Sequence, residues 1–134
     1  MKILVTGGGG FLGQAIVKRL LARGDQVRVL NRRHYPKLEA LGVDCRVGDV
    51  ADRKAVVDAS RGVEAIFHVA AKAGSGLNRA AFYAANVDGT DHVLAACQTH
   101  GIAQLIYTSS PSVVHTGGDI EGGDESLPYP DHFV

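Results

Sequence analysis

A cluster of glycines directly after a short apolar run constrains the fold of this chain more than any other feature. Residues 3–5 read Ile-Leu-Val and residues 6–13 read TGGGGFLG, which places Gly7, Gly10 and Gly13 at GxxGxxG spacing. This order is typical of a strand, a tight turn and a helix. Such glycines let the backbone turn sharply, admit a pyrophosphate without a Cβ in the way, and seat the helix close to the sheet. The stretch favours a dinucleotide-binding turn over an ordinary glycine-rich turn.

Strand and helix patterns alternate along the rest of the chain. The expected strands are 3–5, 27–30, 45–47, 65–71 and 105–108, and the expected helices are 11–23, 36–41, 52–59 and 79–100. Asp52 is a plausible N-cap, while Gly24 and Gly101 are suited to end helices. The alternation predicts an α/β fold, a Rossmann-type doubly wound parallel sheet of about five strands in the order 3-2-1-4-5. Its crevice would lie beyond the carboxyl ends of the first and fourth strands.

Charge and composition divide the chain and exclude several classes of protein. All 14 Lys and Arg residues lie between Lys2 and Arg79, whereas residues 111–134 carry five acids among glycines and prolines. We therefore expect a dinucleotide-binding domain over 1–110 and an acidic loop over 111–134. A mildly basic body suits a phosphate-bearing cofactor, but it lacks the dense basic stripe of a nucleic-acid surface. At 46% hydrophobic and 21% charged residues, the composition is that of a globular protein.

Location and metal content follow from smaller observations. No apolar run reaches the ~18 residues that a spanning helix needs, and a strand begins directly after Met1 and Lys2, so we expect no signal peptide and a cytoplasmic protein. Cys45 and Cys97 fit no metal or redox spacing and are expected to be reduced thiols. The six histidines show no ligand spacing. His68, inside an apolar strand, is expected to be a satisfied core histidine rather than a base.

The end of the second strand bears on the choice of cofactor. An NAD site usually has Asp or Glu there to accept from the ribose 2′-hydroxyl. Here Asn31 stands at that position, followed by Arg32 and Arg33. A guanidinium pairs well with a 2′-phosphate, so the sequence favours NADP over NAD. The alternative is that both arginines are solvated and the site does not discriminate. Asp49, after the third strand, could meet the adenine edge.

Hydroxyl side chains follow the fifth strand. Thr108, Ser109 and Ser110 stand at its carboxyl end, where the crevice of such a sheet receives its ligand. A serine there can hydrogen-bond a substrate carbonyl or alcohol oxygen. The alternative is that these side chains satisfy the backbone of the turn.

With these residues assembled, the chain resembles an extended short-chain dehydrogenase/reductase of the NAD-dependent epimerase/dehydratase superfamily. The matching strings are TGGGGFLG at 6–13, GDVAD at 48–52, HVAA at 68–71, NVDGT at 86–90 and YTSSPSVV at 107–114. The stretch from 107 most resembles the 3β-hydroxysteroid dehydrogenase-like branch, which includes sterol 4-carboxylate 3-dehydrogenases and bacterial reductases of 2-alkyl-3-keto acids. The resemblance covers the N-terminal part of such proteins.

The resemblance implies roles for particular residues. Ser110 aligns with the catalytic serine, and Ser109 is its neighbour. Asn86 would be a structural or relay residue beside the cofactor. The full set of expected cofactor-binding residues is Gly7, Gly9, Gly10, Phe11, Leu12, Gly13, Asn31, Arg32, Arg33, Asp49, Val50, Ala70, Ala71, Lys72 and Asn86. No metal is expected.

The YxxxK motif of the family is absent from these residues. The four tyrosines are followed four places on by Glu39, Val87, Pro111 and Phe133. In the family, the Tyr exchanges the proton and the Lys lowers its pKa, so we expect these 134 residues to lack the general acid–base part of hydride transfer. They are expected to be the N-terminal part of a reductase, with the catalytic helix and substrate lobe missing. The helix at 79–100 would then expose an apolar face, and the resemblance implies homodimers through it.

Three functions are weighed on this basis. The leading one is an NADP-dependent oxidoreductase that interconverts 3-keto and 3-hydroxy groups on a bulky apolar, sterol-like or long-chain acyl substrate, with this chain supplying the cofactor-binding part. The second is a truncated, non-catalytic NAD(P)-binding module, which the missing YxxxK supports. The third is a nucleotide-sugar epimerase or dehydratase, against which the Asn31-Arg32-Arg33 sequence counts.

Overall fold

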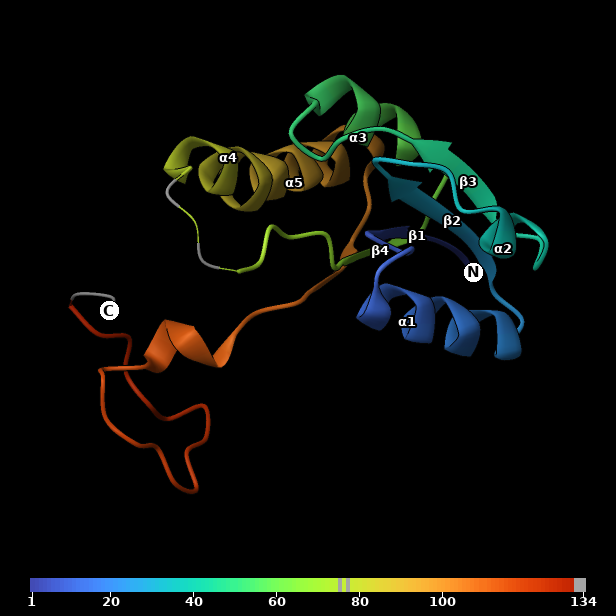
Figure 1. The fold of residues 1–134 in the computed structure, drawn as a ribbon. Coiled ribbons are helices and arrows are strands. Elements are labelled where there is room, and N and C mark those ends of the chain that lie inside the picture. The colour runs from blue at the N-terminus through green and yellow to red at the C-terminus, as the bar shows by residue number, and fades with distance from the viewer. Residues whose placement is uncertain (75, 77, 132–134) are drawn as a thin grey trace.

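A parallel five-stranded sheet with the strand order β3-β2-β1-β4-β5 forms the centre of the computed structural model (Figure 1). The strands are β1 Lys2–Thr6, β2 Gln26–Asn31, β3 Asp44–Val47, β4 Ala65–His68 and β5 Gln104–Tyr107. The observed order confirms the predicted one. Because β1 pairs with both β2 and β4, the turn that follows β1 opens at the middle of the sheet edge.

The structure describes residues 1–74, 76 and 78–131. Ser75, in the loop expected after the fourth strand, and residues 132–134 of the expected acidic segment lie outside the described residues. Within the described part, no helix is long and apolar enough to cross a membrane.

Helices cover both faces of the sheet, α1 and α2 on one side and α3 to α5 on the other (Figure 1). Their bounds are α1 Phe11–Ala22, α2 Pro36–Glu39, α3 Arg53–Ala59, α4 Arg79–Tyr83 and α5 Gly89–His100. The N-cap predicted for α3 is present, since the Asp52 side chain accepts hydrogen bonds from the N–H groups of Lys54 and Ala55. Gly101 ends α5 in the left-handed conformation, with φ of 65°.

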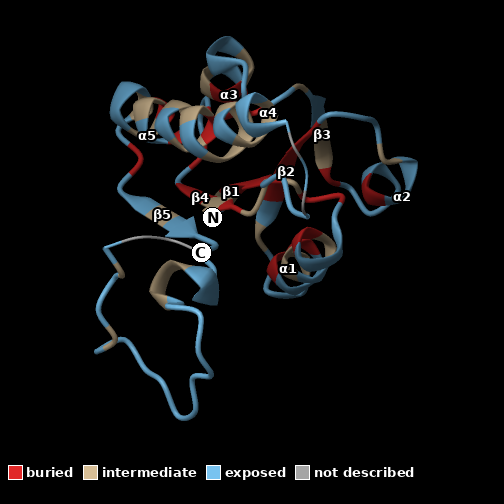
Figure 2. Cartoon of the chain, turned by 60° about the vertical axis from the view of Figure 1, so that its left-hand side comes forward, coloured by how far each residue is buried: buried red, intermediate tan, exposed pale blue. Residues whose placement is uncertain are grey.

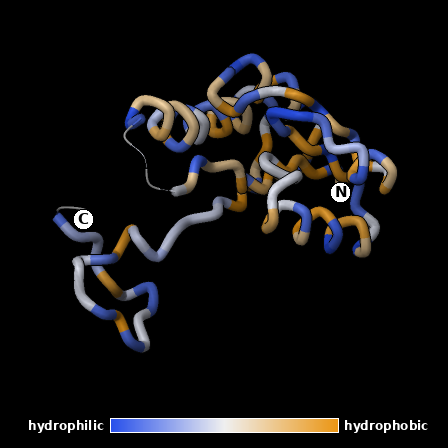
Figure 3. The backbone as a smooth tube through the Cα atoms, in the orientation of Figure 1, coloured by the Kyte–Doolittle hydropathy of each residue, from blue (hydrophilic) through white to orange (hydrophobic). Residues whose placement is uncertain are grey.

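The strands are buried on both faces, and alternate side chains enter two different cores. Leu4 and Ile66 face α3 and α5, whereas Ile3, Val5 and Val29 face α1 and α2. Figure 2 shows the buried residues concentrated in β1, β2 and β4, and Figure 3 shows hydrophobic residues, in orange, at the centre of the sheet and along the helix below it. Two apolar layers therefore hold the sheet edge that carries the glycine turn.

Three predicted elements need correction. The fourth strand ends at His68 rather than at residue 71, because the N–H groups of Val69 and Ala70 donate to the Thr6 hydroxyl instead of continuing the ladder. The helix expected over 79–100 is interrupted by a π-helical turn over Ala84–Asp88. The segment after 110 is not loop throughout, because Pro111–Val114 forms one 3₁₀ turn capped by Ser110.

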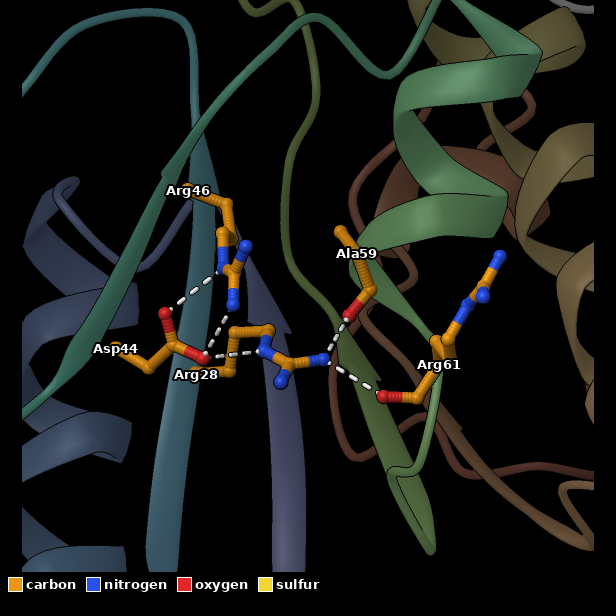
Figure 4. Close-up of polar contacts among 5 residues, drawn as sticks. All are labelled: Arg28, Asp44, Arg46, Ala59 and Arg61. Carbon is orange, nitrogen blue, oxygen red and sulfur yellow. Dashed lines mark hydrogen bonds and ion pairs between the residues drawn. The ribbon is translucent and has the colours of Figure 1, made fainter.

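A buried arginine ties the β2 and β3 edge of the sheet to the end of α3 (Figure 4). Arg28 is 6% exposed. Its Nε donates to Asp44 at 2.7 Å, and its Nη1 donates to the carbonyl oxygens of Ala59 and Arg61, both at 2.8 Å. Burial alone would raise the pKa of Asp44, but hydrogen bonds from Arg46 and Arg28 hold it below its usual value. The guanidinium thus serves as a C-terminal cap for α3.

Substituting Arg28→Met is expected to lower the free energy of unfolding by about 3 kcal/mol, because two helix-end carbonyls lose their donor inside the protein. Arg46→Met is the matched control, since Arg46 binds the same carboxylate from an exposed position. Its loss is expected to cost at most ~1 kcal/mol. Urea unfolding of both variants checks the difference, and equal effects would show that the Arg28 contacts to the carbonyls contribute nothing.

Candidate functional site

A cleft of about 920 Å³ lies at the carboxyl ends of the central strands. Its walls come from the glycine turn and the start of α1, the end of β2, the turn after β3, the loop after β4, and α4. Its lining residues include Gly7, Gly10, Phe11, Leu12, Gly13, Asn31, Arg32, Arg33, Tyr35, Asp49, Val50, Ala70, Ala71, Lys72 and Thr108. The cleft occupies the crevice expected from the strand order.

The glycine turn is packed so closely that a Cβ on Gly7 or Gly13 would collide with backbone atoms. Gly7 has φ of 70°, and a Cβ there would lie 2.9 Å from the Ala70 backbone. A Cβ on Gly13 would overlap the carbonyl oxygen of Gly7 and lie 2.8 Å from Gly8 Cα. Gly10 is different, because a Cβ there would meet protein only at 3.4 Å. Gly10 therefore keeps the cleft side of the turn open rather than allowing the turn to fold.

The N-terminus of α1 faces this turn with its backbone donors available. Gly10 is its N-cap without a side-chain cap, and no acidic residue stands in the first turn. The first N–H bonded within the helix pattern is that of Gln14, which donates to the Gly10 carbonyl. The N–H groups of residues 11–13 have no intrahelical acceptor, and the helix dipole adds positive potential there. This arrangement fits an anionic group such as a pyrophosphate.

At the end of β2, Asn31 has a structural contact, whereas the side chains of the two arginines that follow it are exposed at the cleft. Asn31 is buried, and its Oδ1 accepts a hydrogen bond from the N–H of Gly9 at 2.9 Å. Its amide therefore holds the glycine turn. Arg32 and Arg33 are exposed and line the cleft. Arg33 contacts Tyr35, whereas Arg32 makes no hydrogen bond or ion pair with another described residue.

The turn after β3 places Asp49 and Val50 in the cleft wall. One oxygen of Asp49 accepts from the Ala51 N–H at 2.9 Å, which leaves the other lone pairs of this carboxylate for a donor such as an amino group. Val50 is 8% exposed and belongs to the α3 and α5 core. It can offer only a small apolar surface to a ligand.

The loop after β4 is fixed from behind by Asn86. The N–H of Lys72 donates to Asn86 Oδ1 at 2.7 Å, and Asn86 Nδ2 donates to the Lys72 carbonyl at 3.0 Å. The Lys72 ammonium lies 5.1 Å from the ring centroid of Phe82. Asn86 itself is outside the set of cleft-lining residues, so it supports the wall that Ala70, Ala71 and Lys72 form. The π-helical turn carries this side chain.

His68 lies under the same loop in a hydrogen-bonded chain. The Thr6 hydroxyl oxygen accepts from the N–H groups of Val69 and Ala70, so its own proton goes to His68 Nδ1 at 2.7 Å. His68 Nε2 then donates to Thr90 Oγ1 at 3.2 Å, and the Thr90 hydroxyl donates to the Asn86 carbonyl. Burial lowers the pKa of His68 to about 4. The histidine is therefore neutral and structural, as its sequence context indicated.

Of the three hydroxyl residues after β5, only Thr108 lines the cleft. Its N–H donates to the His68 carbonyl. Ser109 and Ser110 are exposed and are not among the cleft-lining residues. Ser110 Oγ accepts from the Ser112 N–H at 3.2 Å, and it lines a smaller hollow with the segment that follows. The two predicted catalytic side chains thus lie outside the cleft wall that Thr108 helps to form.

Tyr35 lines the cleft but is not among the residues expected from the sequence. The sequence signal for it was an aromatic residue in the turn after the second strand, just before Pro36. Gly9, expected to bind the cofactor, does not line the cleft, because the Tyr35 ring covers it.

Among the described residues, no cluster of three His, Cys, Asp or Glu side chains could hold a metal ion.

Comparison with known proteins agrees with this geometry. Residues 4–134 match the model of the 3-beta hydroxysteroid dehydrogenase/isomerase family. A 2-alkyl-3-oxoalkanoate reductase of Stenotrophomonas maltophilia is 53% identical over 99% of this chain and 41% of its own length. The human sterol-4-alpha-carboxylate 3-dehydrogenase, decarboxylating, is 41% identical over 93% of this chain and 33% of its own length. The chain thus spans between a third and two fifths of the length of these relatives.

Solved structures share the fold. A UDP-glucose 4-epimerase of Thermus thermophilus in complex with NAD has a TM-score of 0.85 and 31% identity, over 97% of this chain and 44% of the epimerase. A short-chain dehydrogenase/reductase superfamily protein of Agrobacterium tumefaciens with bound NAD has the same TM-score at 30% identity, over 97% of this chain and 39% of its own. Together, the family model, the relatives and the cleft place this chain in the 3-beta hydroxysteroid dehydrogenase/isomerase family.

Proposed function

We propose that this chain is the cofactor-binding part of an NADP-dependent oxidoreductase that interconverts a 3-keto and a 3-hydroxy group on a bulky apolar substrate. The named activities of the relatives, 2-alkyl-3-oxoalkanoate reduction and sterol 3-dehydrogenation, support the reaction class. The observation that carries the cofactor choice is the end of β2. There Asn31 is engaged by Gly9, and two guanidinium groups, not a carboxylate, follow beside the cleft.

In this proposal, the glycine turn and the α1 N-terminus bind the pyrophosphate, Arg32 and Arg33 bind the 2′-phosphate, and Asp49 lies near the adenine. Ala70, Ala71 and Lys72 form the wall toward the nicotinamide. The bound nicotinamide would supply or accept the hydride. Ser110, with Ser109 beside it, would hydrogen-bond the substrate oxygen. Since no YxxxK occurs in these residues, we expect cofactor binding by this chain without turnover of a long-chain 3-oxo acid.

Dimerisation through residues 79–100 is part of the proposal. Apolar surface is exposed at Tyr83 in α4, Val87 in the π-helical turn and Leu94 in α5. A second copy presenting the same surface would cover it by a two-fold axis.

Substituting Arg32→Ala is expected to weaken NADPH binding by about tenfold or more, since a charge-assisted phosphate contact is worth roughly 1.5–3 kcal/mol. NADH lacks the 2′-phosphate, so its affinity should stay within about twofold. Calorimetric titration of each variant with both nucleotides measures this. Lys37→Ala, an exposed cation on α2 outside the cleft, is the control. Equal losses for both nucleotides would remove Arg32 from the 2′-phosphate site.

Nucleotide-sugar epimerisation is the second candidate, favoured by the fold likeness to the NAD-bound epimerase of Thermus thermophilus. It requires a site that prefers NAD. A clear preference of this chain for NADH over NADPH would favour the epimerase and would contradict the NADP assignment of the proposed reductase.

A further inference from the structure

We propose that Tyr35 is a specificity-determining residue, because it holds Arg33 in place for the 2′-phosphate of NADP. The inference rests on the proposed function and adds to it a residue that the motif strings do not include. It explains why Gly9 is a glycine although Gly9 does not line the cleft.

Tyr35 is anchored in three ways. Its ring packs against Gly9 so closely that a Cβ on Gly9 would overlap ring atoms Cε2 and Cζ and lie 2.7 Å from Cδ2. Its side chain also packs against the α1 and α2 core. Its carbonyl oxygen accepts from the N–H groups of Leu38 and Glu39 at the start of α2. The ring position is therefore set by the fold before any ligand arrives.

The glycine under the ring is equally fixed. The Gly9 N–H donates to Asn31 Oδ1 at 2.9 Å, and the Gly9 carbonyl accepts from Gln14 Nε2 at 2.8 Å. The Tyr35 ring and the glycine turn thus form one rigid unit at the end of β2. Any other residue at position 9 would push the ring out of this place.

Arg33 is held on this unit by two contacts. Its Nε donates to the Tyr35 hydroxyl oxygen at 3.0 Å, and its Cζ lies 5.3 Å from the ring centroid. The hydrogen bond uses the Nε–H of Arg33, and the ring contact uses one face of the guanidinium. The terminal Nη groups therefore remain available to donate hydrogen bonds to a ligand. Fixing a long arginine side chain in one position costs rotamer entropy. Where the fold has already met that cost, phosphate binding is tighter.

The arrangement favours a dianionic phosphate ester over a hydroxyl. The contacts with Tyr35 hold the Arg33 side chain in place, and Arg32 is the next residue in the lining of the same cleft. Two neighbouring guanidinium groups can form charge-assisted hydrogen bonds with a 2′-phosphate, whereas a neutral 2′-hydroxyl gains little binding free energy from either group. Tyr35 therefore acts through Arg33, and its effect should appear in the NADPH-over-NADH preference rather than in binding as such.

Titration of the full chain and its variants with NADPH and NADH tests this. Tyr35→Leu, which removes ring and hydroxyl, is expected to lower the preference for NADPH about five- to tenfold. Tyr35→Phe, which keeps the ring, should lower it about twofold. In an Arg33→Met background, Tyr35→Leu should leave the preference unchanged. Tyr129→Leu, an exposed tyrosine outside the cleft, should have no effect.

The outcomes separate the two proposals. A wild-type chain without NADPH preference overturns both. A preference that survives Tyr35→Leu, or a Tyr35 effect that persists in the Arg33→Met background, overturns this inference and leaves the proposed function standing. If Tyr35→Leu fails to melt cooperatively, Tyr35→Phe decides, since an unchanged preference overturns the inference and a reduced one supports it.

Discussion

Lowering the pH from 6.5 to 4 is expected to remove about 3 kcal/mol from the free energy of unfolding through His68 alone. The side chain is 1% exposed, and burial lowers its pKa from 6.5 to about 4. The unfolded chain then binds the proton more tightly than the folded one. This contribution is complete above pH 6.5 and is lost progressively down to about pH 4. A proton on Nδ1 would also oppose the hydroxyl that Thr6 donates.

Urea unfolding at several pH values measures this loss. Carboxylates whose pKa is held low, such as Asp44 and Asp58, begin to lose their contributions only at the acid end of this range and lose most of them below their usual pKa of 3.8. His68→Gln should be less stable at neutral pH but nearly flat between pH 6.5 and 4. His34→Gln, at an exposed histidine, is the control and should keep the wild-type slope. A flat wild-type profile, or an unchanged slope in His68→Gln, would contradict the assignment.

Substituting Gly13→Ala is expected to destabilise the chain by roughly 3 kcal/mol and to abolish nucleotide binding. The added Cβ would overlap the Gly7 carbonyl and approach Gly8 Cα, and both are backbone atoms that cannot rotate away. Helix α1 would have to move off the turn. Thermal melting and calorimetric titration with NADPH measure the two effects.

Gly10→Ala is the matched variant. Its Cβ would lie 3.4 Å from the nearest protein atom, at an extended backbone position that any residue adopts. The fold should therefore survive within about 1 kcal/mol, while the methyl group blocks the pyrophosphate. A Gly10→Ala chain that binds NADPH normally would mean that the phosphates lie elsewhere. A Gly13→Ala chain with the wild-type melting temperature would mean that the turn is looser than described.

The sheet could be predicted from sequence because its signals are local. Short apolar strands, the position of the glycine turn after the first strand, and an aspartate cap at Asp52 each act within a few residues. The strand order followed from the turn's place in the chain. The end of β4 was misjudged, because the Thr6 hydroxyl that diverts Val69 and Ala70 lies more than sixty residues away in sequence.

The site was predicted less completely for the same reason. Asn31 stood at the expected position, but its hydrogen bond to Gly9 crosses from β2 to the glycine turn. The contact between Tyr35 and Gly9 and the burial of Arg28 against helix-end carbonyls are also tertiary. The π-helical turn that carries Asn86 has no local signature, because Ala84–Asp88 reads as ordinary helix. Short sequence motifs give no information about such contacts, because the partner residues lie far apart in the sequence.

Calorimetric titration of the 134-residue chain with NADPH and, separately, with NADH tests the central claim most directly. Saturable binding with NADPH clearly preferred is the expected result, because the glycine turn receives the pyrophosphate, and Arg32 and Arg33, which follow β2, receive the 2′-phosphate. A chain that melts cooperatively yet binds neither nucleotide, or that binds NADH more tightly, would contradict it.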